Sequence, residues 1–474
     1  MVRTAHERCV LIMINDDLTK GQISHHFRTL AVPAAFGMLF ATLYNVVDVF
    51  FAGMLGTYAQ AGLAIGYQAF FMMMAVGFGL GSALSALVSI AKGRKDASDT
   101  QKLSYQGISF GVLVSICLVC IGWFTGPWLI HLVSEEGSYR EAALGYFSWL
   151  LFALPAFLLA YGANGILQAN GDSVSLQRAL TVAFFANIGL NPLFIFGIPN
   201  IWSGMGFNGI AAATIVSQTG VVVWVLYRVF RLPYMKTGTR DLFIPKWISF
   251  LEICKQMLPT TAALMVMFLS GFIIQFALKG FGDEALAAYG AALRIEQLLL
   301  LPILGVTGAL LPIAGQNYGA ENYDRVRAAV WFCWKVGFVM AAIALPILWN
   351  GSATAMSVFT NDPKVIANGV SYLRVDALLF PFYMMLFSIN SVLQALKQPV
   401  WTLWISLYRQ GLGVGLFVWI FISYFKLGVI GVWFGIAAAV FTGWLLALYI
   451  VAKVTKSAIG GLRYSVKQTE GRAP

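Results

Sequence analysis

The chain has 474 residues, of which 59% are hydrophobic and only 11% are charged. A soluble domain carries about 25% charged residues, so this composition excludes an ordinary soluble protein. The formal net charge is +11, but no long basic run or nucleic-acid motif appears in the sequence. We therefore expect no nucleic-acid partner. Basic residues collect in the cytoplasmic loops of membrane proteins, which explains the charge more simply.

Long apolar stretches recur along the whole chain, and a helix of about 20 mainly apolar residues crosses a bilayer. The apolar pattern predicts an all-α polytopic membrane protein with twelve transmembrane helices. In the first half they are expected near residues 30–55, 61–90, 103–124, 141–167, 179–197 and 208–229. In the second half they are expected near residues 255–278, 286–314, 328–349, 367–394, 402–424 and 429–452.

Most Lys and Arg residues fall in loops on one side of these spans. The opposite side holds only Arg140, Lys279, Lys364 and Lys426. Because cationic loops stay in the cytoplasm, both termini are predicted to be cytoplasmic. We expect a multi-pass protein of the cytoplasmic (inner) membrane, surrounded by membrane lipids and present as a monomer.

The second half of the chain repeats the first with an offset of about 226 positions. For example, Pro33 matches Pro259, and the GIAAA run that starts at Gly209 matches the one that starts at Gly435. The repeat predicts two six-helix lobes related by a parallel internal repeat, an arrangement that recurs in secondary transporters. The predicted parts are an N-terminal cytoplasmic segment 1–29, an N-lobe 30–230, a linker 231–250, a C-lobe 251–452 and a tail 453–474.

Nucleotide-hydrolysing and metalloprotease signatures are absent from the sequence, so we expect transport driven by an ion gradient and no cofactor. All four histidines lie outside the predicted spans, namely His6, His25, His26 and His131. A membrane-embedded enzyme would need clustered His, acid or Cys ligands within the spans. The chain is therefore not expected to be an enzyme.

Polar residues at membrane depth give the candidate site. A charged side chain at mid-bilayer costs roughly 2.5–3.5 kcal/mol, and Asp48 is the only acid deep in a first-half span. Asn187 and Asn191 share one face of the fifth span, and Thr214 lies at similar depth on the sixth. We expect these four residues to bind the coupling ion, a proton or, as a metal site, Na⁺. The alternative is that the amides and the hydroxyl only join helices.

Other residues extend this hypothesis. Pro33 interrupts the first span, where it is expected to bend the helix that carries Asp48. Aromatic and methionine side chains adapt to varied organic ligands, although each is more often part of ordinary packing. The candidates for a substrate cavity on this basis are Tyr44, Tyr67, Phe70, Met72–Met74, Tyr146 and Tyr161.

The second half carries different intramembrane charges. Arg294 and Glu296 are two residues apart and do not face each other, so each needs a partner on another helix. Arg374 and Asp376 are the candidate partners, and Arg409 is a further buried charge. A structural salt-bridge network and a role in the substrate cavity, for Arg294 and Glu296, stay open as alternatives.

Several motifs together resemble the multidrug and toxic compound extrusion (MATE) transporters. They are NVVDVFFAGMLG around Asp48, LQANGD at 167–172, NIGLNPLFIFG at 187–197, GIAAAT at 209–214 and GQNYGAENYDR at 315–325. The resemblance covers about residues 25–455 and is specific in combination. It implies two six-helix lobes around a central cavity.

Within the family, the chain is similar to the DNA-damage-inducible-protein-F (DinF) and archaeal branch. That resemblance implies that Asp48 couples transport to H⁺ or Na⁺, with Asn187, Asn191 and Thr214 completing the N-lobe site. It also implies cavity-lining roles for Tyr146 and Asn164, and the helix bend at Pro33. Asn191 stands where the family usually has Asp, which favours H⁺ over Na⁺ as the coupling ion.

The C-lobe acids of the NorM branch are also missing, because Met267 and Tyr383 stand at their positions. Glu296 is then the C-lobe acid that remains as a candidate. The sequence as a whole predicts a cation-coupled antiporter that exports small organic, cationic or amphipathic compounds.

Two alternatives to the antiporter remain open. A lipid-linked oligosaccharide flippase of the same superfamily would need a large, strongly basic cavity, whereas the intramembrane charges here are few and mixed. A membrane-embedded enzyme or a channel is the second alternative.

Overall fold

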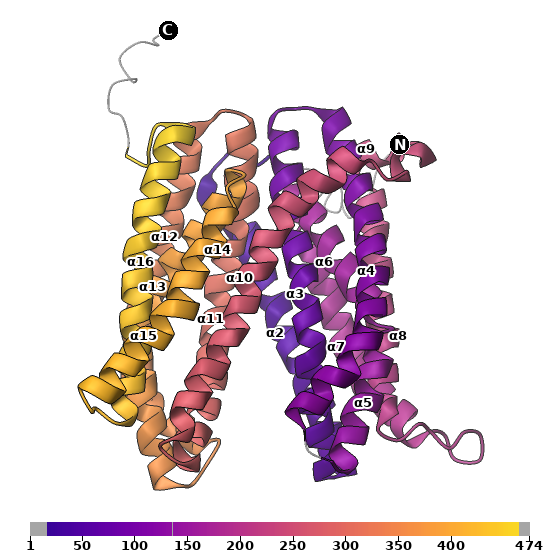
Figure 1. Cartoon of the computed structure of the whole chain (residues 1–474). Coiled ribbons are helices and arrows are strands. Elements are labelled where there is room, and N and C mark those ends of the chain that lie inside the picture. The colour runs from indigo at the N-terminus through magenta and orange to yellow at the C-terminus, as the bar shows by residue number, and fades with distance from the viewer. Residues whose placement is uncertain (1–16, 135, 464–474) are drawn as a thin grey trace. The chain divides into compact units, whose positions relative to one another are not determined.

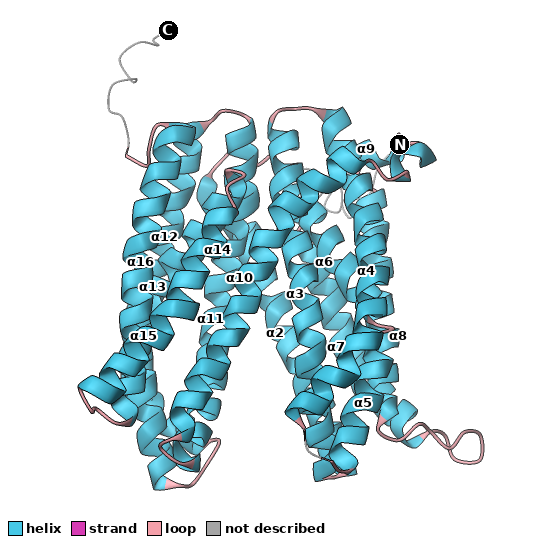
Figure 2. Cartoon of the chain, in the orientation of Figure 1, coloured by secondary structure: helices cyan, strands magenta, loops and turns pink. Residues whose placement is uncertain are grey.

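The computed structural model describes residues 17–134 and 136–463. Regular structure in these residues is helical apart from one isolated bridge between Ile198 and Trp202, as Figure 2 shows. Of the described helices, 11 are long and apolar enough to cross a membrane, and a bent pair raises the number to 12. The prediction of an all-α protein with twelve spans is therefore confirmed.

The chain divides into two compact units. The first contains Thr29–Thr261 and the second contains Leu18–Arg28 and the chain from Ala262 onward. This division differs from the predicted lobes in two places. Residues 18–28, placed before the N-lobe, belong to the second unit, and residues 251–261, placed in the C-lobe, belong to the first. The predicted segments 1–29 and 453–474 extend beyond the described residues.

The first unit is a bundle of long helices, coloured indigo to pink in Figure 1. Its helices are α2 (Ile23–Leu55), α3 (Thr57–Gly93), α4 (Ala97–Val133), α5 (Ser138–Leu150), α6 (Leu154–Ala169), α7 (Val174–Phe196) and α8 (Asn208–Phe230). Helix α3 packs against α4, α5 and α6, and α7 pairs with α8. A Cβ atom on Gly165 of α6 would lie 2.0 Å from the carbonyl oxygen of Gly81 on α3. The two backbones therefore touch, which glycine alone permits.

The fourth predicted span, 141–167, is not one straight helix. The structure breaks it into α5 and α6, which meet at an angle of 50°. Pro155 lies in the first turn of α6, where a residue without a backbone N–H costs no helical hydrogen bond. Its counterpart in the repeat, Pro381, lies inside a continuous helix, α13 (Pro363–Ala395). The proline thus permits the break but does not impose it.

The second unit repeats the plan of the first, with α13 at its centre. Its other elements are the second half of α10 (Trp247–Lys279), α11 (Asp283–Gly319), α12 (Tyr323–Ser357), α14 (Val400–Ser406), η2 (Leu407–Gly413), α15 (Val414–Trp419), η3 (Ile420–Tyr424) and α16 (Val429–Ile459). Helix α13 packs against α11, α12 and α16. Ser391 Oγ donates a hydrogen bond of 2.8 Å to the Thr307 carbonyl oxygen. These residues are the counterparts of Gly165 and Gly81, so a hydrogen bond replaces the glycine contact.

The eleventh predicted span, 402–424, differs from a regular helix. It contains two π-helical segments, η2 and η3, on either side of the short helix α15. The corresponding helix of the first unit, α7, is α-helical throughout. Wider turns of this kind change the direction in which successive side chains point, and they are frequent at functional sites.

The linker that follows α8 belongs to the first unit and packs on α4. It contains α9 (Pro233–Lys236) and η1 (Arg240–Phe243). Gln106 Nε2 donates to the carbonyl oxygens of Leu242 and Ile244 at 2.6 and 2.8 Å. The backbone N–H of Lys246 donates to Gln106 Oε1 at 2.8 Å. One α4 side chain therefore fixes the path of the linker.

The segment before α2 is fixed in a similar way within the second unit. Asn317 Nδ2 donates to the carbonyl oxygen of Leu18 at 3.0 Å, and Gln316 Oε1 accepts from the Leu18 N–H at 3.0 Å. Arg325 adds a hydrogen bond of 3.0 Å to the carbonyl oxygen of Gly21. Polar side chains of the GQNYGAENYDR motif thus hold the start of the described chain.

Candidate ion-coupling site

Three helices of the first unit bring the four predicted ion-coupling residues together. Asp48 comes from α2, Asn187 and Asn191 from α7, and Thr214 from α8. Asp48 is only 3% exposed, and both asparagines are fully buried. The four-residue spacing on α7 places both amides on the face that meets Asp48, as the sequence predicts.

The Asp48 carboxylate accepts hydrogen bonds from all three partners. Asn187 Nδ2 and Asn191 Nδ2 donate to Oδ1 at 3.1 and 2.9 Å. Thr214 Oγ1 donates to Oδ2 at 3.3 Å. Asn191 Nδ2 also donates to Asn187 Oδ1 at 2.9 Å. Among the ion pairs formed by the described residues, none involves Asp48. The carboxylate is therefore stabilised by neutral donors alone.

Tyr44, predicted to line a substrate cavity, lies in this network instead. Its hydroxyl is 2.6 Å from Ser217 Oγ and 3.2 Å from Thr214 Oγ1. Ser217 Oγ donates to the carbonyl oxygen of Ala213 at 2.6 Å, so it accepts from Tyr44. Ser217 is not among the site residues predicted from the sequence. Its spacing of three residues from Thr214 on one helix face is the signal that points to it.

The amide oxygens of the first unit are less well satisfied than the amide nitrogens. Asn191 Oδ1 and Asn164 Oδ1 are buried without a hydrogen-bond partner. A Na⁺ ion binds through oxygen atoms, but the two asparagines of the site present nitrogen to Asp48. In this arrangement the site suits a carboxylate that gains and loses a proton. For Na⁺, the oxygen atoms that already face the site are those of Asp48 and Thr214, and rotation of the amides would add two more.

In the first unit the predicted cavity tyrosines lie near Asp48, because Tyr67 and Tyr146 interact electrostatically with it and Tyr161 interacts with Tyr67. Tyr146 is 1% exposed and packs against Phe207 with ring centroids 5.5 Å apart. Asn164 is buried on α6, whereas Arg294 is exposed on α11. Pro33 lies within α2, which runs through it as one continuous helix.

The predicted partners of the second-unit charges are wrong. Arg374 is exposed, donates to the Trp349 carbonyl oxygen at 3.3 Å and lies over the Trp349 ring. Asp376 is buried and interacts electrostatically with Glu296, a like charge. Because Arg374 and Asp376 are two residues apart on one helix, their side chains point in different directions. They therefore do not both lie beside Glu296. Among the described residues, the positive charge that acts on Glu296 is Arg409 rather than Arg374.

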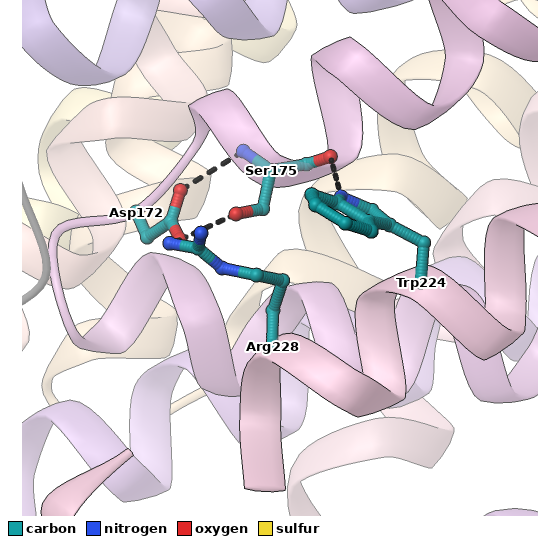
Figure 3. A network of polar contacts seen from close by, with 4 residues as sticks. All are labelled: Asp172, Ser175, Trp224 and Arg228. Carbon is teal, nitrogen blue, oxygen red and sulfur yellow. Dashed lines mark hydrogen bonds and ion pairs between the residues drawn. The ribbon is translucent and has the colours of Figure 1, made fainter. Parts of the chain in front are cut away.

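A second polar network joins the start of α7 to the end of α8, as Figure 3 shows. Asp172, the last residue of the LQANGD motif, pairs with Arg228 Nη2 at 3.1 Å. It also accepts from the N–H and the hydroxyl of Ser175 at 2.9 and 2.6 Å. Trp224 Nε1 donates to the Ser175 carbonyl oxygen at 3.1 Å. This network fixes one end of the α7–α8 pair, while Asp48 lies against the opposite end.

The MatE family model matches the chain twice, over residues 33–193 and 259–419. Both ends of the second match follow those of the first by 226 positions, which confirms the predicted offset of the internal repeat.

Full-length relatives and solved structures agree with this match. The probable multidrug resistance protein NorM of Thermotoga maritima is 24% identical over 434 residues, which cover 89% of this chain and 91% of that protein. An FAD transporter of Shewanella oneidensis is 22% identical over 399 residues, covering 83% and 86%. The crystal structure of a MATE protein in the bent conformation has a TM-score of 0.85 and 23% identity, covering 93% and 98%. That structure shares the fold.

Membership of the DinF-like branch stays a prediction. The two family matches together span well over half of the chain, and the family consists of transporters rather than enzymes. The chain is a multi-pass membrane protein, and it belongs to the MatE family of multidrug and toxic compound extrusion transporters.

Proposed function

We propose that this protein is a proton-coupled antiporter that exports small organic, cationic or amphipathic compounds across the cytoplasmic membrane by alternating access. The observation that carries the proposal is the Asp48 carboxyl group, which is buried among three neutral donors on two other helices. Relatives named as multidrug resistance proteins support the substrate class. The proposal places both termini in the cytoplasm.

Protonation changes what Asp48 needs from its neighbours. The ionised carboxylate uses both amides and the Thr214 hydroxyl as donors. A proton on Oδ2 needs an acceptor instead, and the Thr214 hydroxyl can reverse its role because a hydroxyl both donates and accepts. The neutral group also loses the strong, charge-assisted bonds to α7 and α8. Proton binding thus weakens the attachment of α2, the helix that contains Pro33.

Coupling follows from this difference between the two states. A proton that enters from outside neutralises Asp48 and favours the state in which α2 has moved and the exported compound is released. Proton loss to the cytoplasm restores the charge and the three hydrogen bonds. The N-lobe site thereby links a pH gradient to the position of one helix. Na⁺ remains the alternative ion, and rotation of the amides would add two oxygen atoms to its site.

Transport into inverted membrane vesicles tests the proposal. Wild-type protein should accumulate a cationic dye such as ethidium when a pH gradient is imposed, and an imposed Na⁺ gradient should have no effect. Because Asp48→Asn cannot exchange a proton, it should reduce the uptake to that of vesicles without the protein. The names of the relatives differ in substrate, so a flavin such as FAD is assayed beside the dye.

Glu141→Gln is the matched control, because Glu141 is an exposed acid on α5 of the same unit. It should transport like the wild type, and membrane levels of both variants are measured with an antibody. Normal uptake by Asp48→Asn at a normal membrane level would contradict the coupling role of Asp48. Uptake driven by Na⁺ alone would replace the proton with Na⁺.

A further inference from the structure

A second buried acid, Asp376, lies in the other unit. It belongs to α13 and is only 1% exposed. Both of its carboxyl oxygens are buried, and the Tyr383 hydroxyl is the donor that lies beside them. An ionised carboxylate in such a place is shielded from solvent and has one neutral donor, which is a costly situation for a charged side chain. Burial of this kind is least costly when the carboxyl group is neutral.

Its neighbour Glu296, on α11, is in a different situation. The Tyr372 hydroxyl donates to Glu296 Oε2 at 2.6 Å, the short distance typical of a bond to a charged acceptor. Arg409 of η2 also acts on Glu296 by charge attraction. Glu296 thus has a donor and a counter-charge, both of which stabilise a carboxylate.

Arg409 does not serve Asp376 in the same way. Asp376 is hydrogen-bonded to the Tyr383 hydroxyl and its charged neighbour is Glu296, whereas Arg409 acts on Glu296 and Tyr383. The stem of Arg409 packs against α16, because a Cβ atom on Gly443 would lie 2.8 Å from its Cβ and Cγ atoms. A small residue at this position of α16 therefore leaves room for the arginine on its wide π-helical turn.

The remaining groups around the pair come from each adjacent helix. Tyr289 of α11 and Tyr372 of α13 interact with both acids, and Trp433 of α16 packs against both tyrosine rings. These groups are neutral at physiological pH. If Asp376 and Glu296 were both ionised, the cluster would contain two negative charges. Among the described residues of this cluster, Arg409 would be the one positive charge that opposes them.

We propose that Asp376 is a second proton-binding site, which holds a proton while Glu296 remains ionised beside Arg409. A proton needs a single acceptor, whereas a metal ion needs several oxygen ligands. The described residues contain no group of three or more His, Cys, Asp or Glu side chains that could hold a metal. The site belongs to the second unit alone and shares no residue with the Asp48 site.

The proton at Asp376 exists whether or not the proposed export function is correct. Only its part in transport rests on that function. A protein with one exchangeable proton in each unit can couple two protons to one exported molecule. When Asp376 can no longer ionise, the proton of the second unit no longer takes part in this coupling.

A hydrophobic carbodiimide tests the site without transport, since it modifies protonated carboxyl groups in apolar surroundings. The purified full-length protein is treated with dicyclohexylcarbodiimide at neutral pH, and mass spectrometry locates the modification. Asp376 should be modified and Glu296 should not. Modification of Glu296 with Asp376 untouched would overturn the proposal, and so would protection of Asp376 by Na⁺ at constant pH.

Infrared spectroscopy gives an independent measurement on the same protein. The carbonyl band of a protonated carboxylic acid, which shifts in D₂O, should lose intensity in Asp376→Asn and keep that intensity in Glu296→Gln. An unchanged band in a folded Asp376→Asn variant would overturn the proposal. If that variant does not fold, the carbodiimide result on the wild type decides.

Proton counting in vesicles then separates the two sites. Asp48→Asn should abolish uptake, whereas Asp376→Asn should halve the number of protons exchanged per dye molecule. Should Asp48→Asn transport normally while Asp376 is still modified by the carbodiimide, the proposed function fails and the second site stands. An unchanged ratio in Asp376→Asn would restrict the site to a proton that takes no part in transport, and would overturn the two-proton coupling.

Discussion

The two units each bury an acid, but they treat it in opposite ways. Asp48 in the first unit accepts three hydrogen bonds from neutral donors, whereas Asp376 in the second lies beside the Tyr383 hydroxyl and a second acid, Glu296. The difference does not arise from the fold, because the two family matches share one offset of 226 positions. It arises from which helix positions carry polar residues. A repeated frame thus allows each copy to evolve a different site.

Individual positions of the repeat illustrate this point. The counterparts of the four N-lobe site residues are apolar, namely Ile274 for Asp48, Gly413 for Asn187, Phe417 for Asn191 and Val440 for Thr214. An aromatic contact is kept in both units, because Tyr372 packs against Trp433 at 4.9 Å as Tyr146 packs against Phe207 at 5.5 Å. Packing is therefore repeated where chemistry is not.

The largest stability difference between the units should come from their ion pairs. The Asp172–Arg228 pair of the first unit has side chains only 6% and 16% exposed. Arg228→Ala leaves Asp172 buried without its cation, which costs about 3–5 kcal/mol for such pairs. Because Ser175 still donates two hydrogen bonds, we expect a loss of about 3 kcal/mol in the free energy of unfolding. Denaturant unfolding of the purified protein in detergent measures it.

The control for Arg228→Ala is an exposed pair of the second unit. Lys364 and Glu284 are 3.4 Å apart, with side chains 78% and 41% exposed. Lys364→Ala should change the free energy of unfolding by less than about 1 kcal/mol, since surface pairs are screened by water. Equal losses in both variants would contradict the assignment of Asp172–Arg228 as a structural link between α7 and α8.

A smaller difference should appear at the repeated tyrosines. Tyr372→Phe removes the donor to Glu296 and should lower the free energy of unfolding by about 2 kcal/mol, the usual size for a hydrogen bond to a charged group. Tyr146→Phe keeps the ring contact with Phe207. It should change the free energy of unfolding by less than about 0.5 kcal/mol, the usual size where no special contact is lost. The same unfolding assay compares them, and similar values for both would show that Glu296 does not depend on Tyr372.

Much of this could be predicted from the sequence. Apolar runs gave the spans, the offset gave the repeat, and the four-residue spacing of Asn187 and Asn191 placed them opposite Asp48. The acid of the second unit could not be placed in this way. Whether Asp376 meets Arg374 or Glu296 depends on the rotation of α11 and α13 about their axes, which apolar composition does not determine. The π-helical turns that carry Arg409 leave no clear trace in the residue pattern.

The smallest effect concerns the linker, which packs on α4 and α8 of the first unit. Asn170 Nδ2 donates to the Tyr234 hydroxyl at 2.9 Å, and burial raises the pKa of that hydroxyl. The folded protein then holds this proton more firmly than the unfolded chain. The stability it contributes is full below about pH 10, the ordinary pKa of tyrosine, and is lost as the pH rises further.

Tyr234→Phe removes this one contribution. The variant should lower the free energy of unfolding at pH 7 by less than about 1 kcal/mol, because Asn170 keeps its hydrogen bond to the Ile166 carbonyl oxygen. It should also lose less stability than the wild type above pH 10. Thermal unfolding of both proteins from pH 7 to 11 measures the difference, and identical alkaline slopes would show that the linker leaves α4 before the first unit unfolds.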